Sequence, residues 1–165
     1  MQFDGQQFTS INTIPLEPTI KKGNDRSDNN DIASLKPQFS NRILMIKPYP
    51  GLDYSHFKLD AVDAVLHDLY HSGTACATNQ WGNSHSLLEF VKRCSKQEIP
   101  VYLAPAIKSE NAYQSTRELI DQGAALIWNM SIEAAYVKLM LAYGNFSDKQ
   151  EISGFIGRNI AYEHT

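Results

Sequence analysis

Four short apolar runs, separated by helical patterns, constrain the fold of this chain more than any other feature. They are RILMIKPYP (42–50), DAVLHDLY (63–70), PVYLAP (100–105) and AALIW (124–128). Continuous apolar runs of this length are typical of strands in a parallel sheet, which is buried on both faces. We therefore expect four such strands.

Apolar residues recur at helical spacing in three segments that lie between or after these runs. The three segments are 83–97, 109–123 and 129–144. Ser131 is suited to cap the last of them, and Gly144 is expected to end it as Gly123 ends the second. Ser147–Gln150 has the pattern of a capping box for one further short helix. Together these elements predict an α/β fold: a flavodoxin- or Rossmann-like three-layer domain with a short parallel sheet of about four strands flanked by helices.

The first forty residues differ in composition from the rest. Residues 3–18 alternate enough to form a strand or hairpin, whereas 19–41 are polar and poor in large apolar side chains. Such a polar segment buries too little surface to offset the entropy lost on ordering. We therefore expect a strand-like segment and polar linker over 1–40, and the α/β domain over 41–165.

Composition argues against several classes of partner and cofactor. A net charge of −3 argues against a nucleic-acid partner, and no apolar run reaches the length of a membrane span. The first residues lack the pattern of a signal peptide, and two cysteines are too few for a disulfide framework, so a reducing cytoplasm is expected. Phosphate-binding glycine motifs and the zinc motifs C-x-x-C and H-E-x-x-H are absent. We therefore expect no cofactor and no metal.

Ligands of open α/β sheets bind beyond the carboxyl ends of the strands. The four loops at that edge are 48–53, 70–83, 105–111 and 129–131. The polar or aromatic residues expected near the edge are Lys47, Tyr49, Thr74, Lys108 and Asn129. The alternative is that these loops are ordinary connections, which carry polar residues in any protein.

One loop, YHSGTACATNQ (70–80), invites the hypothesis of a cysteine nucleophile. Such a cysteine needs a base and a group that orients the base. His71 or His85 could serve as the base of Cys76, and Asp68 could orient either, but nothing in their spacing brings them together. Free cysteine behaves mostly as a small buried hydrophobe, so the alternative is that Cys76 is a packing residue, as Cys94 is expected to be on the apolar face of its helix.

Five strings resemble the C-terminal half of the bacterial L-asparaginase family. They are IKPYPGL (46–52), DAVLHDLYHSGTA (63–75), IPVYLAP (99–105), YQSTRELIDQGAALIWNMSIEAAYVKLMLAYG (113–144) and NIAYE (159–163). The family has a Y-P-G after the first strand of this domain, a G-x-G-N-like loop after the second, and an E-A-A-x-x-K-L stretch near its end. The resemblance covers about residues 40–163, and the segment 113–144 is its most specific part.

The resemblance implies hydrolysis of L-asparagine to L-aspartate and ammonia. The family uses a threonine nucleophile and a Thr-Asp-Lys group, carried by T-G-G-T and T-D-T motifs of an N-terminal domain. Neither motif occurs in this chain. No catalytic residue is therefore carried over, and the question of whether the chain alone is an enzyme stays open.

The resemblance also implies two roles for the C-terminal domain: it packs against partner subunits, and it lends a loop to a substrate pocket. That loop corresponds to Ser72–Ala77, where Thr74 replaces a frequent asparagine. The expected substrate-binding residues are therefore Ser72, Thr74 and Cys76, together with Lys108, which lies near the position of a family effector site. A threonine hydroxyl can form one hydrogen bond to a ligand but cannot reproduce both sides of an amide.

Three hypotheses for the function follow. In the first, the chain is the C-terminal domain of an asparaginase-like amidohydrolase, inactive alone, with a separate N-terminal domain as partner. In the second, it is a stand-alone, non-enzymatic module that binds an amino acid or another protein. The third is a cysteine-dependent amidase. A homodimer through helices near 84–96 or 131–143 is expected because a domain without its usual cover exposes apolar surface.

Overall fold

Four parallel strands form the central sheet of this chain, in the order β3-β4-β5-β6. The computed structural model describes residues 2–3, 8–9, 35–70, 73–106, 114–161 and 163–164. The strands are β3 (Ile43–Ile46), β4 (Ala64–Asp68), β5 (Val101–Ala106) and β6 (Ala125–Trp128). They confirm the four apolar runs of the sequence, and their order follows the chain without reversal.

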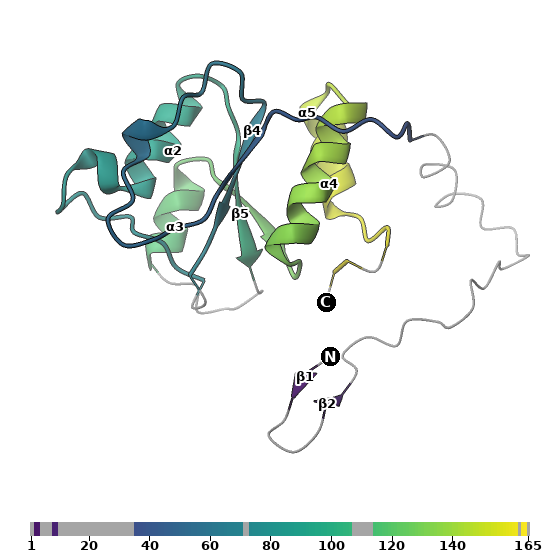
Figure 1. Ribbon diagram of the computed structural model, residues 1–165, viewed down its shortest axis with the longest axis horizontal. Coiled ribbons are helices and arrows are strands. Elements are labelled where there is room, and N and C mark those ends of the chain that lie inside the picture. The colour runs from purple at the N-terminus through teal and green to yellow at the C-terminus, as the bar shows by residue number, and fades with distance from the viewer. Residues whose placement is uncertain are drawn as a thin grey trace, which may run out of the picture.

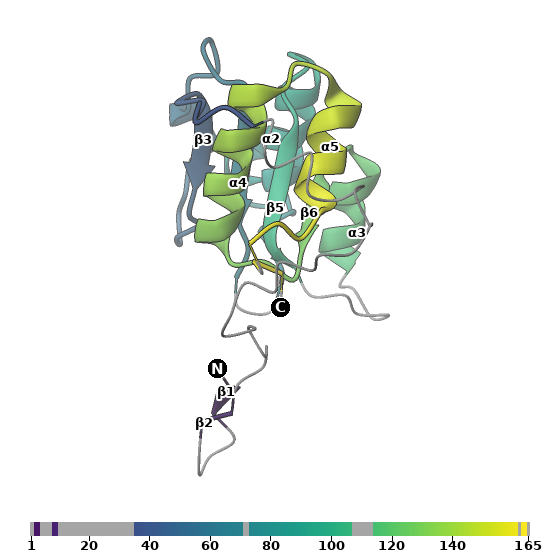
Figure 2. The ribbon, with the colours of Figure 1, turned by 90° about the vertical axis from the view of Figure 1, so that its right-hand side faces the viewer.

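Helices cover both faces of this sheet, so the three-layer prediction is confirmed. The 3-10 turn η1 (Tyr54–His56), α2 (Leu87–Ser95) and α3 (Gln114–Asp121) lie on one face, while α4 (Ile132–Asn145) and α5 (Lys149–Gly157) lie on the other. Figures 1 and 2 show the sheet between these two layers. Each face has its own buried apolar cluster, because side chains alternate along every strand. None of the helices in the described part of the chain is long and apolar enough to span a membrane.

A small hairpin lies within the N-terminal segment. Strand β1 (Gln2–Phe3) pairs antiparallel with β2 (Phe8–Thr9), while residues 10–34 are outside the described residues. Residues 35–40 already contact the α/β domain, where the Ser40 N–H donates to the Met140 carbonyl of α4 at 2.8 Å.

Helix α4 begins as the sequence predicts but ends later. The Ser131 Oγ accepts the Ala134 N–H at 3.2 Å, which confirms the cap. The prediction that Gly144 ends the helix is wrong, because the helix continues to Asn145. Gly144 is required by packing: a Cβ placed there would lie 2.2 Å from the carbonyl oxygen of Gln38. The glycine therefore admits the incoming backbone rather than terminating the helix.

The cap of helix α5 is displaced by one residue from the predicted capping box. Asp148, not Ser147, is the N-cap, and its carboxylate accepts the N–H groups of Gln150 (2.8 Å) and Glu151 (3.0 Å). A carboxylate is a strong acceptor and suits the positive helix N-terminus, so the neighbouring aspartate is favoured over the serine.

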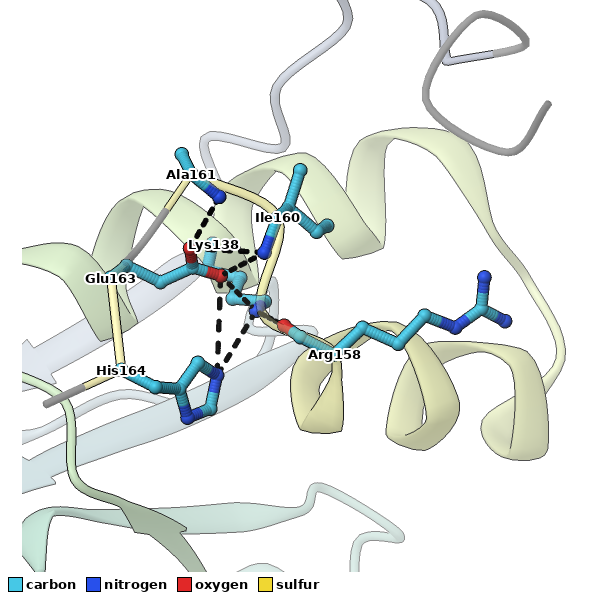
Figure 3. Close-up of polar contacts among 6 residues, drawn as sticks. All are labelled: Lys138, Arg158, Ile160, Ala161, Glu163 and His164. Atoms are coloured by element: carbon cyan, nitrogen blue, oxygen red, sulfur yellow. Dashed lines mark hydrogen bonds and ion pairs between the residues drawn. The ribbon is translucent and has the colours of Figure 1, made fainter. Parts of the chain in front are cut away.

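A buried ion pair fastens the end of the chain to α4. Lys138 donates to the carbonyl of Arg158 and pairs with Glu163, whose carboxylate also accepts the N–H of Ala161 at 2.6 Å (Figure 3). Side chains of Lys138 and Glu163 are only 6% and 14% exposed. Burial alone would raise the pKa of Glu163, but Lys138 and the backbone donors outweigh it and lower the pKa to about 2. We call this group the C-terminal clamp.

Candidate functional site

The loop after β4 is closed by hydrogen bonds at its base. The Gly73 N–H donates to the carbonyl of Tyr70 (2.7 Å), and the Tyr70 N–H donates to the carbonyl of Thr74 (2.9 Å). Gly73 has a φ of +70°, a left-handed conformation that glycine adopts without strain. The hydroxyl of Thr116 on α3 donates to the Gly73 carbonyl at 3.0 Å. The loop is thus joined to a helix on the same face of the sheet.

The second half of the loop leads into the start of α2. The Leu87 N–H donates to the carbonyl of Cys76, and the Ser86 hydroxyl donates to the carbonyl of Ala77, both at 2.8 Å. Ser86 is also the N-cap of α2, since its Oγ accepts the Glu89 N–H at 3.4 Å. Residues 73–77 are therefore positioned from both ends, by β4 and by the first turn of α2.

A cavity of about 500 Å³ lies between this loop and the loop that follows β3. Residues 48–52 form one side of it, and its other side chains are Tyr54, Tyr70, Cys76, Trp81 and His85. The two loops are joined where the His85 Nδ1 meets the carbonyl oxygen of Leu52 at 2.8 Å. The cavity therefore belongs to the carboxyl edge of β3 and β4, where a parallel sheet presents its ligand sites.

A buried tyrosine and histidine lie on the inner side of this cavity. Tyr54 lines the cavity, and its hydroxyl lies 2.8 Å from the Nε2 of His67 on β4. His67 is fully buried. The His67 Nδ1 has no hydrogen-bond partner among the described residues. Burial lowers the pKa of His67 to about 4 and raises the pKa of Tyr54. Both side chains are therefore neutral at pH 7.

This burial predicts a pH-dependent loss of stability. Because the folded-state pKa of His67 lies below its ordinary value of 6.5, the unfolded chain takes up this proton first. The contribution of neutral His67 to the free energy of unfolding is complete above about pH 6.5 and is lost as the pH is lowered towards about 4. In His67→Gln, which cannot titrate, the free energy of unfolding relative to wild type should rise by roughly 2 kcal/mol between pH 7.5 and pH 5. Urea unfolding at the two pH values measures this.

The matched control is His56→Gln, which removes a histidine that is exposed. It should leave the pH dependence of wild type unchanged. An equal pH dependence of wild type and His67→Gln would contradict the assignment of His67 as a buried neutral group.

The structure places two of the four predicted substrate-binding residues. Thr74 and Cys76 are half-buried in the loop after β4, and Cys76 lines the cavity. Ser72 and Lys108 lie outside the described residues, as does His71. These assignments stay predictions.

The structure does not assemble a Cys-His-Asp arrangement from the described residues. The Nδ1 of His85 is engaged with the Leu52 carbonyl, and no hydrogen bond joins His85 to the Cys76 thiol there. Asp68 follows Leu66 by two residues on β4, so it faces the α4 side of the sheet, away from the cavity. Cys94 is fully buried, as expected for a core residue.

Charged residues gather at the same edge of the sheet but on its α4 side. Lys47, directly after β3, pairs with Glu133 in the first turn of α4 at 3.5 Å. Burial, with a smaller contribution from Glu133, raises the pKa of Asp68, and Lys47 opposes the shift. Asn129 follows β6 with a φ of +53°, and its N–H donates to the carbonyl of Ala106 at 2.7 Å. Lys47 and Asn129 thus lie at the predicted edge.

Comparisons with known proteins relate the chain to two groups. No family model matches it. It is 32% identical to a glutamyl-tRNA(Gln) amidotransferase subunit from Metallosphaera sedula over 95% of this chain and 37% of that protein, and 26% identical to its counterpart from Thermofilum pendens over 94% and 36%. The chain therefore spans less than two fifths of the length of the curated relatives it matches.

Solved L-asparaginase structures also match this chain over only part of their own length. The thermostable L-asparaginase from Thermococcus kodakarensis superposes with a TM-score of 0.62 and 26% identity, covering 79% of this chain and 40% of that one. L-asparaginase I from Vibrio cholerae gives a TM-score of 0.59 at 22% identity, covering 79% and 39%, which supports the fold. In sequence and fold the chain is therefore similar to the L-asparaginases, and it corresponds to a C-terminal α/β domain of them.

Proposed function

We propose that this chain acts as the C-terminal domain of an asparaginase-like amidohydrolase and is inactive alone. One observation carries the proposal: relatives and solved asparaginases match the chain over only 36–40% of their own length. The absence of the family's T-G-G-T and T-D-T motifs from the chain agrees with it. The catalytic threonine then comes from another domain. This domain supplies a substrate-proximal loop and a surface for contacts between subunits.

The firm attachment of residues 73–77 supports the loop's assignment. Its hydrogen bonds to α2 and α3 hold the Thr74 hydroxyl at the edge of the domain, where a bound substrate of a neighbouring domain could be reached. We propose Ser72, Thr74, Cys76 and Lys108 as its substrate-binding residues. A loop held in advance loses less entropy on binding than a free one.

The first forty residues fit the same proposal. The alignment to the Metallosphaera sedula protein covers 95% of this chain, and residues 35–165 alone are too few to supply that share. Most of the first 34 residues therefore have counterparts in the relative. We propose that 1–40 is an interdomain strand and linker and that 41–165 is the α/β domain, in a cytoplasmic protein that forms a homodimer.

The proposal predicts that the purified chain releases no ammonia from asparagine or glutamine, because it lacks the family's threonine motifs. A chimera in which residues 35–165 of this chain replace the matching part of the Thermococcus kodakarensis asparaginase should hydrolyse asparagine. Coupled ammonia assays on both proteins measure this.

In the chimera, Thr74→Val should raise KM for asparagine several-fold, since one hydrogen bond to substrate is lost.

Thr78→Val is the matched control, since Thr78 is exposed in the same loop and should leave KM unchanged. Ammonia release by the isolated chain that disappears in Cys76→Ala would favour the cysteine amidase instead. A folded but inactive chimera would count against the proposal.

The relatives' name favours a second candidate, a component of an amidotransferase that acts on glutamyl-tRNA(Gln). The relevant difference is the fate of the amide nitrogen, which an asparaginase releases as ammonia and the amidotransferase transfers to glutamyl-tRNA(Gln). Counting glutaminyl-tRNA formed per ammonia released by a reconstituted protein distinguishes the two. Binding of asparagine by the isolated chain, seen by calorimetry, would instead favour the stand-alone module.

A further inference from the structure

The cavity between the loops after β3 and β4 has an aromatic and uncharged lining. Tyr49, Tyr70 and Trp81 are 56%, 37% and 72% exposed, and no Asp, Glu, Lys or Arg side chain among the described residues lines the cavity. Its volume of about 500 Å³ lies in the range of small-molecule sites, which are mainly apolar with a few fixed polar groups. The lining therefore offers no ion-pair partner to a charged ligand and favours a ring that can stack on aromatic faces.

His85 supplies the fixed polar group. A carbonyl oxygen has no proton to give, so the contact of 2.8 Å requires that His85 Nδ1 carries the proton and donates it to the Leu52 oxygen. In the neutral ring, Nε2 is then an acceptor and is the remaining polar atom of this cavity-lining side chain. Because Leu52 and His85 belong to different loops, their bond both fixes the tautomer and joins the two sides of the cavity.

We propose that this cavity binds a small, neutral, planar ring that carries an O–H or N–H donor. The ring stacks among Tyr49, Tyr70 and Trp81, and its donor bonds to Nε2 of His85. The site uses residues of this chain alone, so it goes beyond the proposed function and stands or falls independently of any catalytic partner.

Phenol and anisole test the proposal, because they share a ring and differ in the single O–H donor. The chain has two tryptophans, and Trp128→Phe leaves Trp81 as the only one, at the mouth of the cavity. Its emission, excited at about 295 nm and pH 8, should change saturably with phenol. One hydrogen bond is worth about 1 kcal/mol, so phenol should bind about fivefold more tightly than anisole.

His85→Asn separates the donor contact from the structure of the loops. The amide nitrogen of asparagine can take the place of Nδ1 and keep the bond to Leu52, but it leaves no acceptor in the place of Nε2. In this variant the affinity for phenol should fall to that for anisole, while the affinity for anisole stays unchanged.

Three results would overturn the proposal. They are the absence of a saturable response to either ring, equal affinities of phenol and anisole in the protein with a native His85, and tighter binding of tetramethylammonium or benzoate than of phenol. The comparison of phenol with anisole needs no change at His85, so the test holds even if His85→Asn does not fold.

Discussion

Glu163→Gln is expected to lower the free energy of unfolding by about 3–5 kcal/mol, a large part of the stability of a domain this size. The change leaves the Lys138 ammonium, only 6% exposed, without its carboxylate. It also weakens the acceptor for the N–H groups of Ile160 and Ala161. Urea unfolding at pH 7, followed by circular dichroism, measures the loss.

The pH dependence of this loss has a defined sign. The folded-state pKa of Glu163 is about 2, below its ordinary value of 4.5, so its stabilisation is complete above pH 4.5 and lost as the pH falls towards 2. The difference between wild type and Glu163→Gln should therefore shrink over that interval. The double variant Lys138→Met/Glu163→Gln should regain much of the loss, because it leaves no buried charge unpaired.

Glu151→Gln is a suitable control, since Glu151 is exposed on α5. It should change stability by about 0.5 kcal/mol or less. Equal losses in Glu151→Gln and Glu163→Gln, or a double variant less stable than Glu163→Gln, would contradict the clamp as a buried ion pair.

Gly144→Ala is expected to destabilise the domain by about 1–3 kcal/mol. Alanine is favoured over glycine within a helix by about 1 kcal/mol, so helix propensity alone predicts the opposite sign. The added methyl group would lie 2.2 Å from the Gln38 oxygen and 3.0 Å from the Phe39 Cα, both of them backbone atoms. Residues 36–39 must then move away from α4. Thermal and urea unfolding measure the change.

Gly154→Ala in α5 provides the matched comparison. Gly154 is exposed, and its nearest neighbour to an added Cβ is the end of the Arg158 side chain at 4.0 Å. This variant should gain up to about 1 kcal/mol. Two glycine-to-alanine changes of the same sign would show that the approach of residues 36–39 to α4 does not determine the effect.

The sequence predicted the sheet well because its signals are local. Each strand is a continuous apolar run, and Ser131 and Gly123 have the cap functions that their residue types favour. The assignment of Gly144 as a helix end is wrong because the glycine is needed for the close approach of Gln38, a contact between residues more than a hundred positions apart. The buried position of Lys138 could have been noticed, since it falls on the same helical face as Leu139 and Ala142.

The candidate site was predicted only in part. Composition and resemblance drew attention to Thr74 and Cys76, which are local to one loop. Trp81 and His85 follow in the same connection, but Tyr54 and residues 48–52 join them in one cavity only because the connections after β3 and β4 meet at the same edge of the sheet. The spacing of residues along the chain does not predict that these two connections lie side by side. An exposed tryptophan in a polar loop is nevertheless a signal of a binding surface.

The bond from Thr116 to Gly73 has a consequence for the loop after β4. Thr116 is only 5% exposed in α3, so its hydroxyl cannot exchange the Gly73 carbonyl for water while the helix stays in place. This bond therefore ties the loop after β4 to α3 at a point where water does not readily replace the hydroxyl.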